Sequence, residues 1–195
     1  MFLELLNAWA VSFDLPILEW IQANMAHPIL DLIMPIITLL GDAGIFWIAC
    51  SAILIFTKKY RRTGFAMMIA LMMGLVVCNM ILKPTVARIR PYDFQMEMFG
   101  KEIKLLIDAQ HDYSFPSGHT IASFEACVAL LLGSKKLGIP ATLLAILIAF
   151  SRLYLYVHYP TDVIASVILG SLFGIIGHLI TRNINFSMKG KYLSK

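Results

Sequence analysis

Residues 64–82 read GFAMMIALMMGLVVCNMIL and contain no charged side chain. A helix that crosses the hydrocarbon of a bilayer needs about 20 largely apolar residues. Further apolar segments of similar character occur at residues 118–133, 138–157 and 163–180. The whole chain is 59% hydrophobic and 14% charged, whereas soluble proteins carry about a quarter of charged residues. The sequence therefore predicts an all-α integral membrane protein.

A longer apolar run covers residues 29–57. As one helix it would be roughly 43 Å long at 1.5 Å per residue, longer than a hydrocarbon core of about 30 Å. Pro35 and residues 41–44 (GDAG) are the expected break points, because proline and glycine interrupt helices. We expect a short helix that dips into the membrane and then a spanning helix that ends at Thr57.

Residues 2–24 mix apolar positions with Glu4, Asp14 and Glu19, a pattern typical of a helix that lies along the membrane interface. The alternative is a sixth span, which would place charge and the kink at Pro16 in hydrocarbon. The predicted fold is thus a bundle of five transmembrane helices, six if residues 2–24 also span, preceded by an amphipathic N-terminal helix.

No linker, low-complexity tract or internal repeat divides the chain, which predicts one domain over residues 1–195. Within it we expect an amphipathic segment at 1–27, the helical bundle at 28–182 and a basic cytoplasmic tail at 183–195. The net charge is +4, but the basic residues are dispersed, so we expect no nucleic-acid partner. The three cysteines lie in apolar stretches without CxxC spacing, which argues against a metal site or a disulfide framework.

The basic residues predict the orientation of the helices, because cytoplasmic loops are enriched in lysine and arginine. In a five-span arrangement ten of them share one side: Lys58, Lys59, Arg61, Arg62, Lys135, Lys136, Arg182, Lys189, Lys191 and Lys195. The other face then receives residues 83–117 and the turn near residues 158–162. Three polar clusters lie on that face.

The first cluster is KPTVARIRP at residues 83–91. It places Lys83 and Arg90 just past the end of a predicted spanning helix, where Pro84 stops the helix. Two cations at the bilayer surface can hold the non-bridging oxygens of a phosphate, arginine through two parallel hydrogen bonds and lysine as a point charge.

The second cluster is PSGH at residues 116–119. Ser117 is a plausible N-cap, and Gly118 allows close approach to the free N–H groups of the first helical turn. A helix N-terminus is an anion site. His119 lies in the same turn, where it can donate a proton to a departing oxygen.

The third cluster contains Arg152, His158 and Asp162. Arg152 lies deep enough in the membrane to need an anionic partner. Asp162 follows His158 by four residues and can accept the imidazole N–H, which fixes the tautomer and stabilises the imidazolium. Taken singly, such arginines and lysines reach for headgroups, and a Ser-Gly before a helix is a cap. The convergence of all of them on one face favours a functional site.

Together the clusters have the pattern K-x6-R-P, P-S-G-H and S-R-x5-H-x3-D, in that order. This pattern resembles the three-part signature of the type 2 phosphatidic acid phosphatase superfamily, and all eleven specified positions match. The resemblance covers roughly residues 29–180. Relatives include phosphatidylglycerophosphate, undecaprenyl pyrophosphate and lipid A phosphatases, and a soluble vanadium-dependent haloperoxidase branch, against which the apolar spans argue.

The resemblance implies that His158 is a nucleophile that forms a phosphohistidine, that Asp162 orients it and that His119 is the general acid. It implies no metal and no cofactor. It assigns the phosphoryl group to five positions: Lys83, Arg90, Ser117, Gly118 and Arg152. Two other expectations concern weaker features. Arg88 is left open as a contact to headgroups or phosphate, and Asn79, Glu125 and His178 are expected to bond between helices.

The loop from Tyr92 to Phe115 is expected to be an interfacial lid over the site, or a loop adhering to the membrane. The predicted function is hydrolysis of a membrane lipid phosphate or pyrophosphate through a phosphohistidine. Undecaprenyl pyrophosphate ranks first because its leaving group is a phosphate, and phosphatidylglycerophosphate and phosphatidic acid follow. The non-enzymatic alternative is a lipid-phosphate binder or transporter. The expected location is a bacterial plasma membrane, with the site on the extracytoplasmic side.

Overall fold

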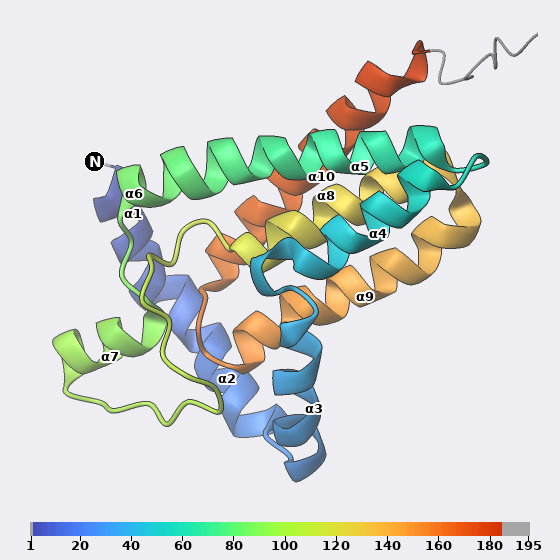
Figure 1. Cartoon of the computed structure of the whole chain (residues 1–195). Helices are drawn as coiled ribbons and strands as arrows, with labels where there is room; N and C mark the ends of the chain where they lie inside the picture. Colours follow the sequence, from blue (N-terminus) through green and yellow to red (C-terminus); the bar gives the residue numbers. More distant parts are fainter. Residues whose placement is uncertain (1, 185–195) are drawn as a thin grey trace, which may run out of the picture.

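The computed structural model describes residues 2–184, and every element in that range is a helix. The elements are α1 (Phe2–Trp9), the π-helix η1 (Ala10–Asp14), α2 (Leu15–Met25), α3 (Pro28–Leu39), the 3₁₀ turn η2 (Asp42–Gly44), α4 (Ile45–Phe56), α5 (Arg61–Gly74), the π-helix η3 (Leu75–Leu82), α6 (Lys83–Val86), α7 (Pro91–Phe99), α8 (Gly118–Gly133), α9 (Lys135–Tyr154) and α10 (Pro160–Arg182). Figure 1 shows α4, α5, α8, α9 and α10 running alongside one another.

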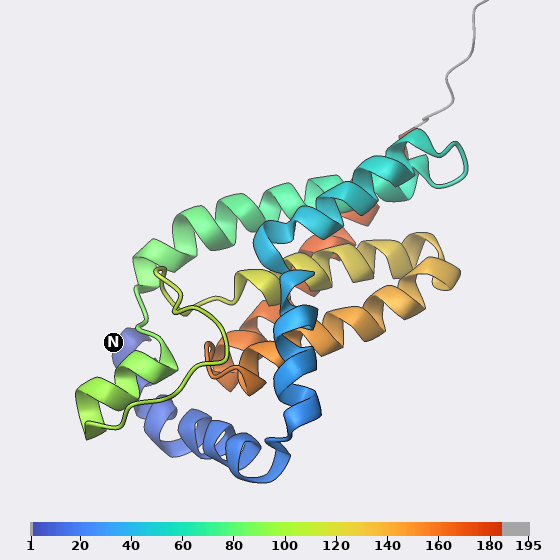
Figure 2. The ribbon, with the colours of Figure 1, turned by 60° about the horizontal axis from the view of Figure 1, so that its bottom comes forward.

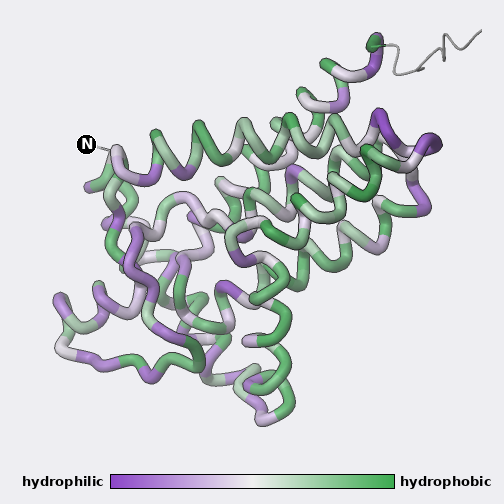
Figure 3. Tube along the Cα trace, in the orientation of Figure 1, coloured by the Kyte–Doolittle hydropathy of each residue, from purple (hydrophilic) through white to green (hydrophobic). Residues whose placement is uncertain are grey.

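Helix α8 lies at the centre of this bundle and packs against α5, α9 and α10. Glycines let α10 approach it closely: a Cβ added at Gly170 or Gly174 would lie 2.8 Å from a carbonyl oxygen of α8. Small residues at such contacts are typical of helix packing in membranes, where apolar side chains gain little by leaving lipid for protein. Hydropathy follows the same layout, with apolar helices and polar segments gathered toward the two ends (Figure 3).

Three helices are long and apolar enough to cross a membrane: the helix that begins at Arg61, α9 and α10. The pair α3 and α4, bent by 41°, makes a fourth if it is one span, and α8 is apolar but only 16 residues long. The all-α membrane class is therefore confirmed. The count of five requires α8 to span as well and stays a prediction.

The run at residues 29–57 is interrupted at one of its two expected break points. Gly44 has a φ of +67°, in the left-handed region that glycine adopts without strain, and the chain changes direction there. The expected break at Pro35 is wrong, because Pro35 lies inside α3. Gly41 packs against His119, since a Cβ at Gly41 would lie 2.8 Å from His119 Cδ2.

Residues 2–25 are helical, as expected, but they are more than a surface segment. Leu15, Leu18 and Ile21 are buried against the chain that links α9 to α10, and Asp14 is fully buried. Figure 2 shows α1 and α2 across the end of the bundle, close to α7. Whether this segment also touches a membrane interface stays a prediction.

The basic residues around the α4–α5 connection, those at the start of α9 and Arg182 lie at one end of the bundle, and the three polar clusters lie at the other (Figure 1). This separation is the one that the five-span arrangement requires. The predicted tail at 183–195 lies outside the described residues except for Asn183 and Ile184.

Candidate active site

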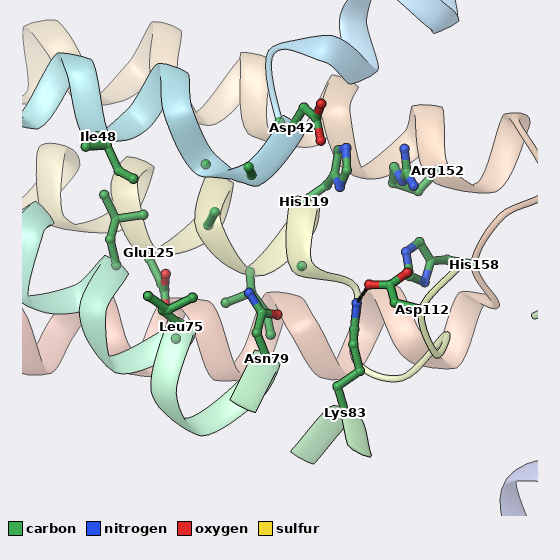
Figure 4. A pocket seen from close by; sticks show the side chains of 18 of the residues that line it. Asp42, Ile48, Leu75, Asn79, Lys83, Asp112, His119, Glu125, Arg152 and His158 are labelled. Atoms are coloured by element: carbon green, nitrogen blue, oxygen red, sulfur yellow. Dashed lines mark hydrogen bonds and ion pairs between the residues drawn. The ribbon is translucent and has the colours of Figure 1, made fainter. Parts of the chain in front are cut away.

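A cavity of about 470 Å³ opens between η2, α4, α5, η3 and α8, at the end of the bundle that holds the polar clusters. Figure 4 shows the side chains that line it. One part of the wall is apolar and includes the side chains of Ile48 and Leu75. The polar and charged lining residues are Asp42, Asn79, Lys83, Arg90, Gln110, Asp112, His119, Glu125, Arg152 and His158.

Arg152 is the most deeply placed cation of this cavity, near the C-terminal end of α9. Its side chain is 1% exposed, and its Nη1 donates to Thr38 Oγ1 at 2.7 Å. Its Nε and Nη2 have no hydrogen-bond partner among residues 2–184. A buried guanidinium with unused donors is costly unless an anion binds it.

Lys83 and Arg90 hold a carboxylate from the loop above them. Lys83 Nζ donates to Asp112 Oδ2 at 2.5 Å, and Arg90 Nη2 donates to Asp112 Oδ1. Burial raises the pKa of Asp112, but the hydrogen bond and charge of Lys83, with those of Arg90, hold it below its ordinary value. A carboxylate thus lies between two cations that were predicted to hold a phosphate.

His158 lies between the cations and a second carboxylate. Its Nε2 is 3.1 Å from Arg90 Nη1, and its Nδ1 is 3.4 Å from Ser114 Oγ. Ser114 Oγ in turn donates to Asp162 Oδ2 at 2.5 Å, whereas His158 Nδ1 is 3.6 Å from that oxygen. The expected pairing of His158 with Asp162 is therefore close, but Ser114 makes the hydrogen bond to the carboxylate.

His158 is 1% exposed, and its surroundings oppose a second proton. Burial, followed by the charges of Arg90 and Arg152, holds the pKa of His158 well below its ordinary value. The imidazole is therefore neutral at neutral pH, and one ring nitrogen keeps a lone pair. Nε2 is the nitrogen without a proton, because it faces Arg90 Nη1, which can only donate. An unprotonated imidazole nitrogen is the form that can attack phosphorus.

Behind Asp162, Arg88 joins two buried carboxylates. Arg88 Nη1 donates to Asp162 Oδ1 at 2.5 Å, and Nη2 donates to Asp14 Oδ2 at 2.8 Å. The guanidinium also lies 3.6 Å from the ring centre of Tyr159. Arg88 is fully buried in this network, so the open expectation that it contacts headgroups or phosphate is wrong. It instead fixes Asp162 and ties the N-terminal helices to the site.

The start of α8 contributes His119 and Gly118 to the cavity wall, as predicted. Ser117 lies behind the wall: its N–H donates to Ser166 Oγ, and its Oγ accepts from Thr120 Oγ1. The predicted contact of Ser117 with phosphate is therefore not prepared in this structure and stays a prediction.

The structure thus brings together Lys83, Arg90, Gly118, His119, Arg152 and His158 around one cavity, with Asp162 behind His158. Sequence reasoning missed the roles of Ser114, Asp112 and Asp14. The signal for Asp14 was its charge in a largely apolar segment that also carries Glu4 and Glu19. Asn79 and Glu125, which were expected to bond between helices, both line the cavity.

No group of three or more histidine, cysteine or acidic side chains in residues 2–184 is arranged to hold a metal ion. The fold and the cavity define a class: an all-helical membrane protein with a cavity lined by three cations and two histidines. Residues 63–186 match the family model described as the PAP2 superfamily. This match covers more than half of the chain, which therefore belongs to the PAP2 superfamily.

Named relatives agree with this assignment. The chain is 36% identical over 126 residues to an undecaprenyl-diphosphatase of Sulfolobus acidocaldarius, a match to 64% of this chain and 58% of that protein. It is 28% identical over 184 residues to phosphatidylglycerophosphatase B of Bacillus subtilis, covering 87% and 78%. The crystal structure of Aquifex aeolicus LpxE superposes with a TM-score of 0.71 at 27% identity, covering 84% and 93%. The chain thus spans little more than half of the archaeal relative.

Proposed function

We propose that this protein is a membrane phosphatase that hydrolyses a lipid phosphate or lipid pyrophosphate through a phosphohistidine. The observation that carries the proposal is Arg152, a buried guanidinium whose Nε and Nη2 have no hydrogen-bond partner in the described chain and which lines the cavity together with Lys83 and Arg90. A phosphoryl group would supply the missing acceptors and the opposing charge. The hydrocarbon chain of the bound lipid would lie along the apolar part of the cavity wall.

In the first step the lone pair of His158 Nε2 attacks phosphorus. A P–N bond forms, the bond from phosphorus to the leaving oxygen breaks, and His119 donates a proton to that oxygen where the leaving group needs one. Lys83, Arg90 and Arg152 stabilise the charge that builds on the other phosphoryl oxygens. Ser114 and Asp162 hold the Nδ1 side of the imidazole.

In the second step water attacks the phosphohistidine. His119 in its neutral form takes the proton from the water, the P–N bond breaks, and inorganic phosphate leaves. His158 returns to its neutral form. Lys83, Arg90 and Arg152, which together form the phosphate clamp, stay in place throughout. The same clamp therefore serves both steps without a change of geometry.

We rank undecaprenyl pyrophosphate first among substrates, with phosphatidylglycerophosphate and phosphatidic acid next. A pyrophosphate releases a phosphate, which is a far less basic leaving group than the alkoxide from a phosphate monoester. The archaeal relative named as an undecaprenyl-diphosphatase supports this order, and the Bacillus relative supports the second. We place the protein in a bacterial plasma membrane, and the positive-inside rule supports an orientation with the site on the extracytoplasmic face.

The test is release of inorganic phosphate by protein purified in detergent, with each lipid in mixed micelles. His158→Ala should lose turnover, whereas His111→Ala, an exposed histidine in the loop above the cavity, should keep it. His158→Ala should still bind orthovanadate, because Lys83, Arg90 and Arg152 are unchanged. Activity within tenfold of wild type in His158→Ala would exclude it as the nucleophile. No release of phosphate by the wild type from any of these lipids would favour a binder or transporter.

A further inference from the structure

The cavity continues past the phosphate clamp into a side arm. This arm is lined by Ile48, Leu71, Met72 and Leu75, of which Ile48, Met72 and Leu75 are exposed. Exposed apolar side chains that line a cavity suit the hydrocarbon chain of a lipid. The arm is therefore the expected path of the lipid tail.

Two polar side chains interrupt this apolar arm. Asn79 lies on η3, is exposed to the cavity, and makes no hydrogen bond to any residue in the described chain. Glu125 on α8 is 1% exposed, and its Oε1 has no partner among residues 2–184. Of the two, Asn79 is the one whose amide is exposed at the cavity wall with hydrogen-bonding groups that no residue of the described chain uses.

Asn79 lies beside the start of α8. A Cβ added at Gly118 would be 3.3 Å from Asn79 Oδ1 and 3.8 Å from Asn79 Nδ2. Lys83 follows Asn79 on the same wall, and Figure 4 shows Asn79 between Lys83 and Glu125. The amide thus lies next to the clamp, on the side that leads into the arm. π-helical segments such as η3 often occur at functional sites, where they turn a side chain out of the regular register.

A plain hydrocarbon chain attached directly to the phosphate in the clamp would place apolar groups beside the Asn79 amide and offer it no hydrogen-bond partner. A lipid pyrophosphate would not, because its second phosphate follows the first at once. We propose that Asn79 binds the phosphate that leaves with the lipid, and that it thereby makes the enzyme selective for lipid pyrophosphates over lipid monophosphates.

This inference rests on the proposed function, since it needs the terminal phosphate in the clamp. His158 attacks the terminal phosphorus, the bond from that phosphorus to the bridging oxygen breaks, and the electron pair leaves with the lipid monophosphate. Asn79 Nδ2 donates a hydrogen bond to a non-bridging oxygen of this leaving phosphate. That bond stabilises the charge that the leaving group gains in the transition state.

The test compares kcat/KM on a polyprenyl pyrophosphate and on the monophosphate of the same chain. Asn79→Leu should lower kcat/KM on the pyrophosphate by about 10- to 100-fold, the effect expected for one hydrogen bond to a charged group, and on the monophosphate by less than about threefold. Glu125→Gln removes a carboxyl deeper in the same arm and should leave the ratio unchanged. Met80→Ala, a neighbouring residue outside the cavity lining, controls for damage to η3.

Binding provides a second readout that needs no turnover. Asn79→Leu should weaken protection by methylenediphosphonate against thermal unfolding, with Kd raised about tenfold or more, and leave protection by inorganic phosphate unchanged. The role of Asn79 would be overturned if Asn79→Leu lowered kcat/KM equally on the pyrophosphate, the monophosphate and phosphatidic acid. It would also be overturned if Glu125→Gln changed the ratio as much as Asn79→Leu does, or if Asn79→Leu left diphosphonate binding unchanged. Failure of the proposed function would be seen in the wild type, which would then hydrolyse neither lipid.

Discussion

Asp112 occupies the place that a phosphate is expected to take. Its carboxylate bonds Lys83 and Arg90, and its side chain is 56% exposed in the loop above the cavity. A substrate phosphate must displace it to reach both cations. Asp112→Asn keeps the shape of the side chain and removes its charge, so phosphate should bind the variant more tightly.

The magnitude follows from the two ion pairs. Because Asp112 is more than half exposed, each pair is worth about 0.5–1 kcal/mol. Loss of both removes about 1–2 kcal/mol of competition, and 1.36 kcal/mol corresponds to a factor of ten. The inhibition constant of orthovanadate or inorganic phosphate should therefore fall by roughly 5- to 30-fold at pH 7.

The assay is competitive inhibition of phosphate release from a lipid substrate, with Asp108→Asn as the control for an equal charge change in the same loop. The pKa of Asp112 lies below its ordinary value, so the carboxylate competes at neutral pH. As the pH falls through that lowered pKa, Asp112 becomes protonated and the difference between wild type and variant should vanish. An unchanged or higher inhibition constant in Asp112→Asn at pH 7 would mean that Asp112 supports Arg90 instead of blocking the site.

Three further predictions concern the N-terminal anchor, the nucleophile and the orientation. Asp14→Asn removes one carboxylate from the buried Arg88 and should lower the free energy of unfolding by about 3 kcal/mol. Its unfolding midpoint in detergent should be lower than that of the exposed control Ser12→Ala, and equal midpoints would refute the anchor. Because the pKa of His158 is well below its ordinary value, protonation should not silence the nucleophile between pH 7 and pH 5. After correction for the titration of the substrate's own phosphate group, with a pKa of about 6, kcat/KM on an aryl phosphate should change by less than about threefold. A remaining tenfold fall centred near pH 6.5 would contradict this. A cysteine at Gln110 should react with an impermeant reagent added outside intact cells and one at Lys135 should not; the reverse result would place the site in the cytoplasm.

The helices and their membrane setting could be predicted from the sequence because both depend on local properties. Each uncharged run, such as residues 64–82, must form a helix in hydrocarbon to satisfy its own backbone. The glycines at residues 41–44 marked the break after α3, and this too is a local property, because glycine readily adopts the left-handed backbone conformation found at Gly44. Pro35 did not break its helix, because the cost of a proline depends on whether its surroundings satisfy the freed backbone groups, and these surroundings are tertiary.

The residues around the cavity were also largely predictable, since the three clusters carry Lys83, Arg90, His119, Arg152 and His158. Their partners were not. Ser114 stands 44 positions before His158, and Arg88 meets Asp162 and Asp14 at separations of 74. A charge in the sequence shows that a partner is needed, because an unpaired buried charge is too costly. Only the packing of distant segments decides which partner it has, and so why Arg90 faces the cavity while Arg88, two residues before it, is buried behind Asp162.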